Sequence, residues 1–306
     1  MSAPSVTVAV LTYNGEQYLD ELLTAVEAQQ YPGQVELLVI DSGSTDATLR
    51  IVRRHPEARL HQIPNAEFGH GRTRDLAARL ATGELVAYLT HDAIPPSPDW
   101  LRGLVEPLVD DERIAAVVGK QIPRPDAPPV LKYDIQRVFA RLGPDYGYSV
   151  AYDDGTLDDE GARNAAAFYS DANSAARRAV LTGAVPYRDV PYAEDQQLGR
   201  DIIDAGLRKA YAPRGAVLHS NDVTFATLAA RIAADQEGLR SIGRELPHVS
   251  RRAALAQALR WSYLDVPRIV VDREYPVRRR LWWLLANPWW QLRKWNAYRA
   301  ASSRSL

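Results

Sequence analysis

The chain has 306 residues, of which 46% are hydrophobic and 25% are charged, as expected for a folded protein with one large domain and an appendage. Its formal net charge of −1 gives no indication of nucleic-acid binding. It contains no cysteine, which excludes disulfide bonds and thiolate metal sites.

Short apolar runs alternate with helical patterns through the first 120 residues. Strands are predicted at Val6–Leu11, Val35–Ile40, Arg59–Ile63, Leu85–Thr90 and Ile114–Gly119. Helices are predicted between them, at Gly15–Gln30, Thr45–Arg54, Arg72–Ala81 and Pro98–Val109. This alternation predicts an α/β fold with a mostly parallel central sheet and helices on both faces.

The pattern is less regular beyond residue 120. Prolines at 123, 125, 128 and 129 favour an irregular segment over residues 121–170, and the acidic stretch Asp153–Glu160 is expected to be an exposed loop. Regular structure is expected again at Ser174–Leu181, in a helix over Glu194–Ala205, and in short strands at Lys209–Ala212 and Ala216–His219. After His219 the pattern is helical.

Polar residues follow three of the predicted strands, which is where ligands bind in open α/β sheets. Thr12-Tyr13-Asn14 follows the first strand, Asp41 ends the second, and His91-Asp92 follows the fourth. Parallel strands bring these positions to one edge of the sheet. Asp41 suits the N–H and hydroxyl donors of a nucleotide, although it also suits a turn that caps the next helix. Tyr13 suits either base stacking or packing.

Three further residues each have a structural and a chemical interpretation. Asp92 suits a helix cap, or a Mg²⁺ or Mn²⁺ ion that also binds substrate phosphates. Asp195, after Glu194, opens a predicted helix, where acids favour the helix dipole, and it also suits a general base. His219 ends the last short strand and is either structural or a further contact to metal or pyrophosphate.

In this order the motifs resemble family 2 glycosyltransferases of the GT-A fold, over roughly residues 5–240. The family motifs are Thr12-Tyr13-Asn14, Asp41–Asp46, Thr90–Ala93 and Glu194–Gln196. Further stretches look like the rhamnosyltransferase branch, which uses dTDP-β-L-rhamnose on cell-envelope glycans: Phe68–Arg74, Gly119–Arg124, Ser170–Ala175 and His219-Ser220.

The resemblance implies an inverting, metal-dependent hexosyltransferase that acts on a hydroxyl of a cell-envelope glycan or lipid-linked saccharide. Asp195 matches the catalytic base and Asp92 the ligand of Mg²⁺ or Mn²⁺, with His219 as a second metal contact. The nucleotide site would comprise Thr12, Tyr13, Asn14, Asp41, Arg74 and His91. The sugar and acceptor pocket would comprise Asp171, Asn173, Ser174 and Glu194.

Some positions depart from the family pattern. His91 stands where Asp or Gln is expected, Asp75 where Asn is expected, and Asn221-Asp222 follow Ser220 where the family has a Ser-His pair. The donor sugar is therefore more open than the reaction type, and a UDP-hexose or galactofuranose donor is the alternative. A neutral His91 could itself approach the metal.

Other functional classes are less favoured. A non-catalytic sugar-nucleotide-binding protein would not need both Asp92 and Asp195. Sugar nucleotidyltransferases carry a glycine-rich loop with arginine after the first strand, whereas Thr12–Glu16 has one glycine and no arginine. A dehydrogenase would need a Gly-x-Gly-x-x-Gly motif after a strand, and none is present.

We expect a GT-A catalytic domain over residues 1–220, with a nucleotide-sugar half of about 1–120 and an acceptor half of about 121–220, and a helical region over 221–306. From Pro267 onwards the chain has nine Arg and Lys against two acids, and six of seven tryptophans lie at or after Trp261. Two interpretations stay open: an interfacial helix on an anionic membrane, or packing against the catalytic domain or another subunit of a homo-oligomer. Without a signal peptide or a membrane-spanning run, a cytoplasmic location is expected.

Overall fold

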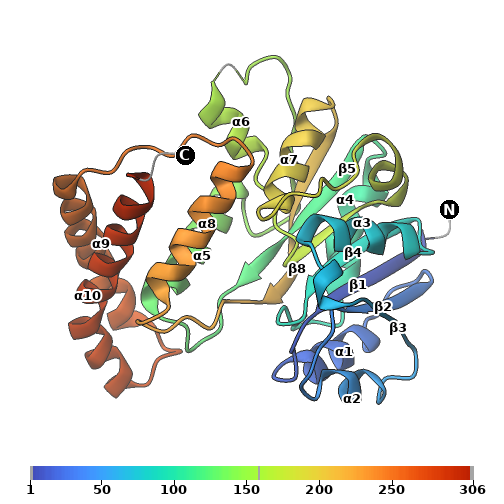
Figure 1. Cartoon of the computed structure of the whole chain (residues 1–306), viewed down its shortest axis with the longest axis horizontal. Coiled ribbons are helices and arrows are strands. Elements are labelled where there is room, and N and C mark those ends of the chain that lie inside the picture. The colour runs from blue at the N-terminus through green and yellow to red at the C-terminus, as the bar shows by residue number, and fades with distance from the viewer. Residues whose placement is uncertain (1–2, 158, 304–306) are drawn as a thin grey trace. The chain divides into compact units, whose positions relative to one another are not determined.

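A computed structural model describes residues 3–157 and 159–303 of the chain (Figure 1). The structure divides into two compact units. The sheet unit comprises Met1–Ile122 and Phe139–His219, and the helical unit comprises Pro123–Val138 and Ser220–Leu306. The segment of four prolines thus belongs with the C-terminal helices.

The described part of the sheet unit contains a sheet of eight strands in the order β3-β2-β1-β4-β7-β5-β8-β6. The strands are β1 (Val6–Thr12), β2 (Val35–Asp41), β3 (Ala58–Gln62), β4 (Leu85–Thr90), β5 (Ile114–Ile122), β6 (Ser149–Ala151), β7 (Asn173–Arg177) and β8 (Arg208–Leu218). Neighbouring strands are parallel except that β7 is antiparallel to β4 and β5, and β6 to β8. The predicted mostly parallel sheet is confirmed.

Helices connect these strands. They are α1 (Leu19–Glu27), α2 (Thr48–Val52), the 3-10 helix η1 (Asn65–Glu67), α3 (His70–Leu80), α4 (Trp100–Asp110), α6 (Glu160–Ala166), the π-helix η2 (Val180–Ala184) and α7 (Glu194–Asp204). Apolar faces of α1 and α4 pack on the sheet through Leu22, Leu104 and the fully buried Trp100. Burial of β1 and β4 on both faces explains why their sequences are almost continuously apolar.

The expectation of an irregular segment over residues 121–170 was wrong. Helix α5 (Pro129–Leu142), strand β6 and helix α6 lie there. Pro129 occupies the first turn of α5, where a missing N–H removes no helical hydrogen bond. The side chain of Asp159 caps α6 by accepting a hydrogen bond from Ala162 N at 2.7 Å. The two short strands expected after Lys209 are one strand, β8, with an irregularity in its pairing with β5.

The helical unit contains part of α5 together with α8 (Leu228–Ser241), α9 (Arg251–Val271) and α10 (Val277–Ser302). Their shared core includes Tyr133, Ile269, Trp283 and Trp290. The helical C-terminal appendage is therefore confirmed. Among the residues described, no helix is both long and apolar enough to cross a bilayer.

Candidate active site

The sheet topology brings the predicted polar positions to one edge. Thr12 pairs with Asp41 at the ends of β1 and β2, and Leu11 pairs with Thr90 at the end of β4. Because β7 is antiparallel to β4, its first residue, Asn173, lies opposite Leu89 at the same edge. The ends of β5 and β8 also lie there, since both strands are parallel to β4.

The loops after β1 and β2 carry several polar side chains. Asp41 is fully buried, and its Oδ2 accepts hydrogen bonds from Gly43 N and Ser44 N, both at 3.1 Å. Its Oδ1 and the hydroxyl of Thr12 are buried and have no hydrogen-bond partner within the described residues. Buried polar atoms normally have hydrogen-bond partners, so these two acceptors are exceptions among the described residues.

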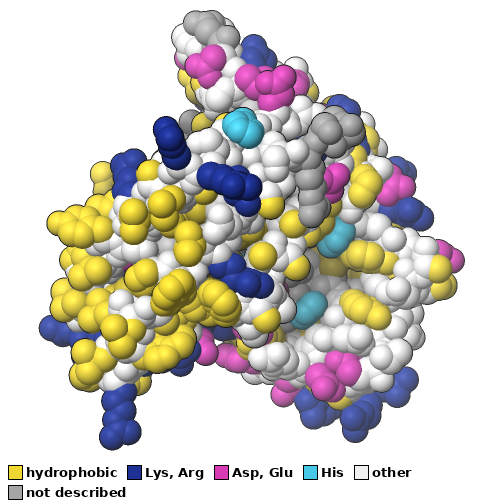
Figure 2. All heavy atoms as spheres, turned by 60° about the vertical axis from the view of Figure 1, so that its left-hand side comes forward, with side chains coloured by type: hydrophobic (Ala, Val, Ile, Leu, Met, Phe, Trp, Pro, Cys, Tyr) yellow, Lys and Arg dark blue, Asp and Glu magenta, His cyan; other side chains and the backbone are white. Residues whose placement is uncertain are grey.

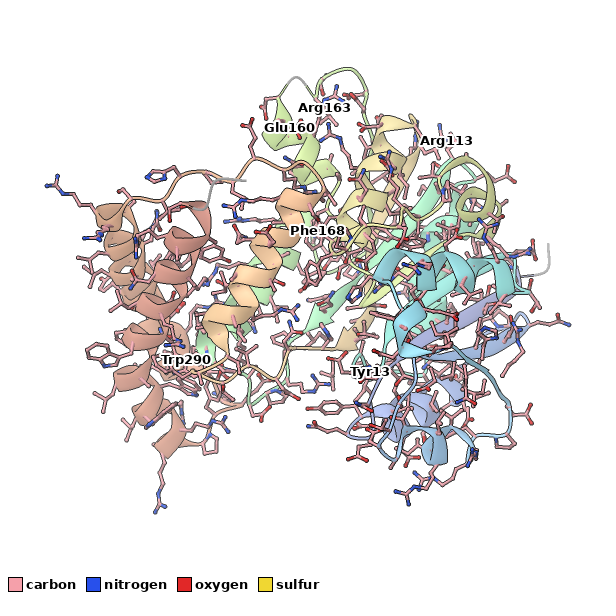
Figure 3. All side chains as sticks on the ribbon, in the orientation of Figure 1. Tyr13, Arg113, Glu160, Arg163, Phe168 and Trp290 are labelled. Atoms are coloured by element: carbon pink, nitrogen blue, oxygen red, sulfur yellow. The ribbon has the colours of Figure 1, made fainter. Side chains whose placement is uncertain are left out.

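Asn14, Tyr13 and His91 complete this region. Asn14 has a left-handed φ of 48°, and its Oδ1 accepts a hydrogen bond from Thr45 N at 2.9 Å, which ties the two loops together. Tyr13 is 45% exposed beside this junction and offers an open ring face (Figure 3). The ring of His91 lies against the first loop, since a Cβ at Gly15 would be 3.0 Å from His91 Cγ.

Asp92 and His219, the two expected metal contacts, lie next to each other in the structure. Two backbone hydrogen bonds between Ile94 and Leu218, at 3.0 and 2.8 Å, hold the segment after β4 against the end of β8. This places Asp92 Oδ2 3.4 Å from His219 Nε2. Burial acts to raise the pKa of Asp92, but the hydrogen bond and charge of His219, with smaller contributions from Thr90 and His91, hold it well below its usual range.

Gln121, at the end of β5, orients this histidine. Its Oε1 lies 2.9 Å from His219 Nδ1, and its Nε2 donates a hydrogen bond to Ser170 Oγ at 2.9 Å. These contacts make Nδ1 the donor, so Nε2 faces the carboxylate either with a proton or with a metal ion between them. The described residues include no cluster of three or more metal-binding side chains, so such an ion would also need oxygen atoms of a bound substrate.

Arg74 lies in a buried charge cluster. The side chain, 6% exposed, forms ion pairs through Nε with Asp171 Oδ2 at 2.9 Å and through a terminal nitrogen with Glu194 Oε1. Its charge is therefore already matched by two carboxylates. The structure places Arg74 next to Asp171 and Glu194, and its expected role beside the base and pyrophosphate stays a prediction.

Asp195 lies next to this cluster, in the first turn of α7. Its Oδ1 accepts a hydrogen bond from Gln196 N at 2.7 Å, and its Oδ2 accepts one from Asp171 N at 3.4 Å. Burial, followed by the charges of Glu194 and Asp171, raises the pKa of Asp195 from 3.8 to about 7, although Arg74 opposes the rise. A carboxylate with such a pKa can accept a proton near neutral pH.

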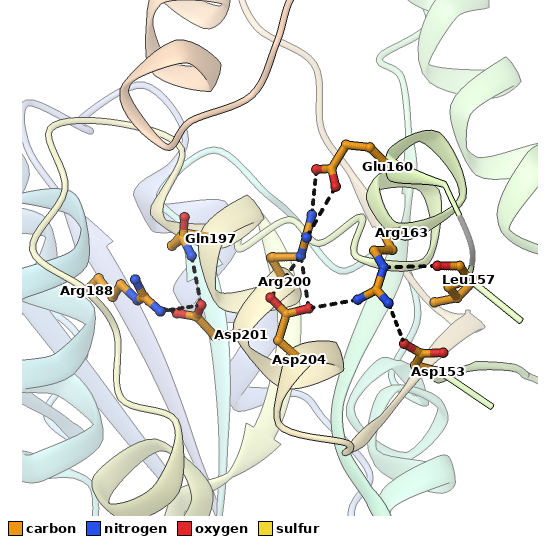
Figure 4. A network of polar contacts seen from close by, with 9 residues as sticks. All are labelled: Asp153, Leu157, Glu160, Arg163, Arg188, Gln197, Arg200, Asp201 and Asp204. Carbon is orange, nitrogen blue, oxygen red and sulfur yellow. Dashed lines mark hydrogen bonds and ion pairs between the residues drawn. The ribbon is translucent and has the colours of Figure 1, made fainter. Parts of the chain in front are cut away.

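The helix that carries Asp195 is held in place by a network of charged side chains (Figure 4). Arg188 makes two hydrogen bonds to Asp201, both at 2.7 Å. Arg200 pairs with Asp204 at 2.9 Å and with Glu160 at 2.7 Å. The acidic stretch that ends at Glu160 is thus linked to α7, although it was expected to be only an exposed loop. Several interlinked contacts restrict α7 more than isolated surface pairs would.

Asn173 and Ser174 lie behind the site. Both are fully buried. Asn173 accepts a hydrogen bond from Trp100 Nε1 at 3.1 Å and donates to Gly215 O at 2.6 Å, while Ser174 donates to Asp171 Oδ1 at 2.6 Å. The expectation that these two side chains line a sugar pocket stays a prediction; in the structure their polar atoms hydrogen-bond within the protein.

Two residues beside the candidate site were given no role from the sequence, although Gln121 lies within the motif Gly119–Arg124. Gln121 could have been found by the rule used for the other strands, since it is a polar residue near the end of a buried strand. Ala193 has a left-handed φ of 61° immediately before Glu194 and Asp195. A non-glycine residue in this conformation is uncommon and often marks a functional site, but the sequence carries no signal for it.

Comparisons with known proteins agree with this geometry. The family described as glycosyl transferase family 2 matches residues 7–181. The chain therefore belongs to family 2 of the glycosyltransferases, and its fold is GT-A with a helical appendage. It is 31% identical over 223 residues to the O-antigen chain rhamnosyltransferase RfbN of Salmonella typhimurium, with 72% of this chain and 67% of that one covered. It is 33% identical over 227 residues to the O-antigen chain rhamnosyltransferase WbaN of Salmonella anatum, with 72% and 68% covered.

Solved structures show the same fold. The mannosyltransferase PcManGT from Pyrobaculum calidifontis, in complex with GDP-Man and Mn²⁺, has a TM-score of 0.56 and 25% identity, with 100% of this chain and 79% of that chain covered. TarS of S. aureus, residues 1–349, has a TM-score of 0.55 and 19% identity, with 97% and 90% covered. The likeness to TarS concerns the fold alone.

Proposed function

We propose that this glycosyltransferase moves L-rhamnose from dTDP-β-L-rhamnose, with inversion, to a hydroxyl of a cell-envelope glycan or lipid-linked saccharide. The observation that carries the proposal is Asp195, a carboxylate with a pKa of about 7 beside the strand edge that also holds Asp41 and Asp92. Two O-antigen rhamnosyltransferases among its relatives favour rhamnose as the sugar.

The nucleotide would bind at the loops after β1 and β2. Asp41 Oδ1 and the Thr12 hydroxyl are buried acceptors without partners in the described chain, and a pyrimidine N–H can satisfy one of them. The exposed ring of Tyr13 can stack on the base. Asn14 would position the loop and not contact the nucleotide through Oδ1, since that oxygen already accepts a hydrogen bond from Thr45 N.

A divalent metal would bind between Asp92 and His219. One carboxylate oxygen and one imidazole nitrogen suit Mn²⁺ or Mg²⁺ when diphosphate oxygens complete the coordination. When bound, the metal would neutralise the charge of the departing diphosphate. The mannosyltransferase of the same fold that holds GDP-Man and Mn²⁺ supports this assignment.

Asp195 would take the proton of the acceptor hydroxyl as the hydroxyl attacks the anomeric carbon. Glu194 and Asp171 raise its proton affinity, and Arg74 balances their charges so that the cluster remains folded. We therefore assign Arg74 and Glu194 to positioning of the base. Transfer with inversion needs only this one carboxylate on the acceptor side.

A donor panel tests the proposal. Thermal unfolding would be followed with dTDP-rhamnose and with UDP- and GDP-sugars, each with and without Mn²⁺, and the anomeric configuration of any product would be determined by NMR. We expect stabilisation and consumption of dTDP-rhamnose and an α-linked product. Consumption of a UDP-hexose or UDP-galactofuranose alone would show that this sugar nucleotide, and not dTDP-rhamnose, is the donor. A β-linked rhamnoside would refute inversion.

A further inference from the structure

The inner side of the hairpin of α9 and α10 contains a buried polar cluster. Asp265 of α9 is fully buried, and its Oδ2 accepts hydrogen bonds from Asn287 Nδ2 at 3.1 Å and Gln291 Nε2 at 2.8 Å, both on α10. Its Oδ1 pairs with Arg137 of α5 at 3.3 Å. The contact between these helices thus contains a charged group and two amides in addition to the apolar side chains of the core.

The outer side of the same hairpin is apolar. Leu281, Trp282, Leu285 and Trp289 recur along one face of α10, and Leu285 and Trp289 are 76% and 66% exposed. On α9, Leu255, Leu259, Tyr263, Val266 and Val270 are also exposed. The exposed tryptophans differ from Trp283 and Trp290, which are buried in the core of the helical unit.

Basic side chains surround this surface. Hydrophobic side chains gather over the two helices, with Lys and Arg around them (Figure 2). The exposed arginines of the hairpin are Arg251, Arg252, Arg260, Arg273, Arg278 and Arg279. Over the described residues of the hairpin the only exposed acid is Glu274, and it pairs with Lys132 at 2.6 Å. The surface therefore combines an apolar centre with uncompensated positive charge.

We propose that the outer face of α9 and α10 docks onto an anionic phospholipid membrane. Exposed Trp and Leu would enter the boundary between headgroups and acyl chains, and the arginines would bind lipid phosphates. The exposed leucines and tryptophans support this occupant, because their apolar surface would leave water on docking while the surrounding arginines meet anionic headgroups. Neither helix could cross the bilayer, so the hairpin would lie on the surface.

A second copy of the chain fits this face less well. In a two-fold symmetric dimer the same patch would face itself, which would bring the arginines of both copies together without acids to pair with them. A membrane with anionic headgroups provides the opposite charge. The proposal goes beyond the transfer reaction, and its test needs neither donor nor acceptor.

Vesicle flotation of the full chain tests the proposal, with vesicles of phosphatidylcholine alone and with phosphatidylglycerol added. The vesicle affinity of the triple variant Leu259→Ser, Leu285→Ser, Trp289→Ser should fall about tenfold or more for each side chain that would otherwise enter the membrane. The matched control is Val109→Ser with Tyr146→Ser, two exposed apolar residues of the sheet unit. Neutralising Arg252 and Arg278 to Gln should reduce binding to the anionic vesicles about fivefold each.

Circular dichroism and thermal unfolding would establish that each variant is folded, as expected for substitutions at exposed positions. Binding of the triple variant equal to that of the control would overturn the proposal. So would equal binding of the unchanged chain to neutral and anionic vesicles. If vesicles do not bind and the triple substitution instead converts a dimer to a monomer in light scattering, the face belongs to a second copy and the membrane proposal fails.

Discussion

Replacing Asp195 with Asn should abolish transfer and at the same time stabilise the protein above neutral pH. The pKa of Asp195 rises from 3.8 to about 7 in the folded state, chiefly through burial and then through Glu194 and Asp171. The folded state therefore holds the proton more tightly than the unfolded state. The free energy of unfolding should fall as pH rises from about 4 to 7 and remain level above that.

The size of the effect follows from the shift. Each pKa unit corresponds to about 1.36 kcal/mol of unfolding free energy. A shift of about three units therefore limits the stability gain of Asp195→Asn at high pH to about 4 kcal/mol. Partial access of Asp195 to water and its coupling to Glu194 reduce this, and we expect about 2 kcal/mol at pH 8. Asn keeps the shape of the side chain and its hydrogen bond from Gln196 N, but cannot carry the charge.

Urea unfolding of the wild type and of Asp195→Asn would be compared at pH 5 and pH 8, together with donor consumption in the presence of acceptor. The stability advantage of the variant should be larger at pH 8, and turnover should fall by about 10²–10⁴. Asp110→Asn, at an exposed position of α4, is the control and should show no such pH-dependent gain. A variant with no advantage at pH 8 would refute the reasoning about burial, and normal turnover would remove Asp195 from its role as base.

Three further predictions concern the rest of the site. Arg74→Met should lower the free energy of unfolding by about 3–5 kcal/mol, because it leaves Asp171 and Glu194 buried without their cation; an unchanged urea midpoint would contradict this, and adding Glu194→Gln should restore part of the loss. Gln121→Leu should weaken Mn²⁺ binding in the presence of dTDP about 10–100-fold by calorimetry, because His219, the proposed second metal contact, loses the hydrogen bond that orients it; wild-type affinity would show that this hydrogen bond has no such role. Chelator should remove donor binding, and Mn²⁺ or Mg²⁺ should restore it; donor affinity unchanged in chelator would refute the metal site.

Several features could be predicted because they depend on short-range patterns. Apolar runs located the strands, and the rule that ligands bind beyond the ends of parallel strands pointed to Asp41 and Asp92. Asp195 was singled out as an acid at the start of a predicted helix and by the family resemblance. The four prolines between residues 123 and 129 predict an irregular segment, whereas Pro129 begins α5, because a proline in the first turn is compatible with a helix. Local sequence does not distinguish a proline that begins a helix from a proline that interrupts one.

The sequence by itself determined the α/β order of the chain, the positions of its candidate carboxylates and the basic, Trp-rich character of its C-terminal region. Only the tertiary structure decided their partners. Arg74 meets Asp171 and Glu194, and Gln121 meets His219, across about a hundred residues or more of chain. It also decided that α10 turns Trp282 and Trp289 outwards and Trp283 and Trp290 inwards. A side chain's pKa and exposure depend on what packs around it, and packing joins segments that periodicity treats separately.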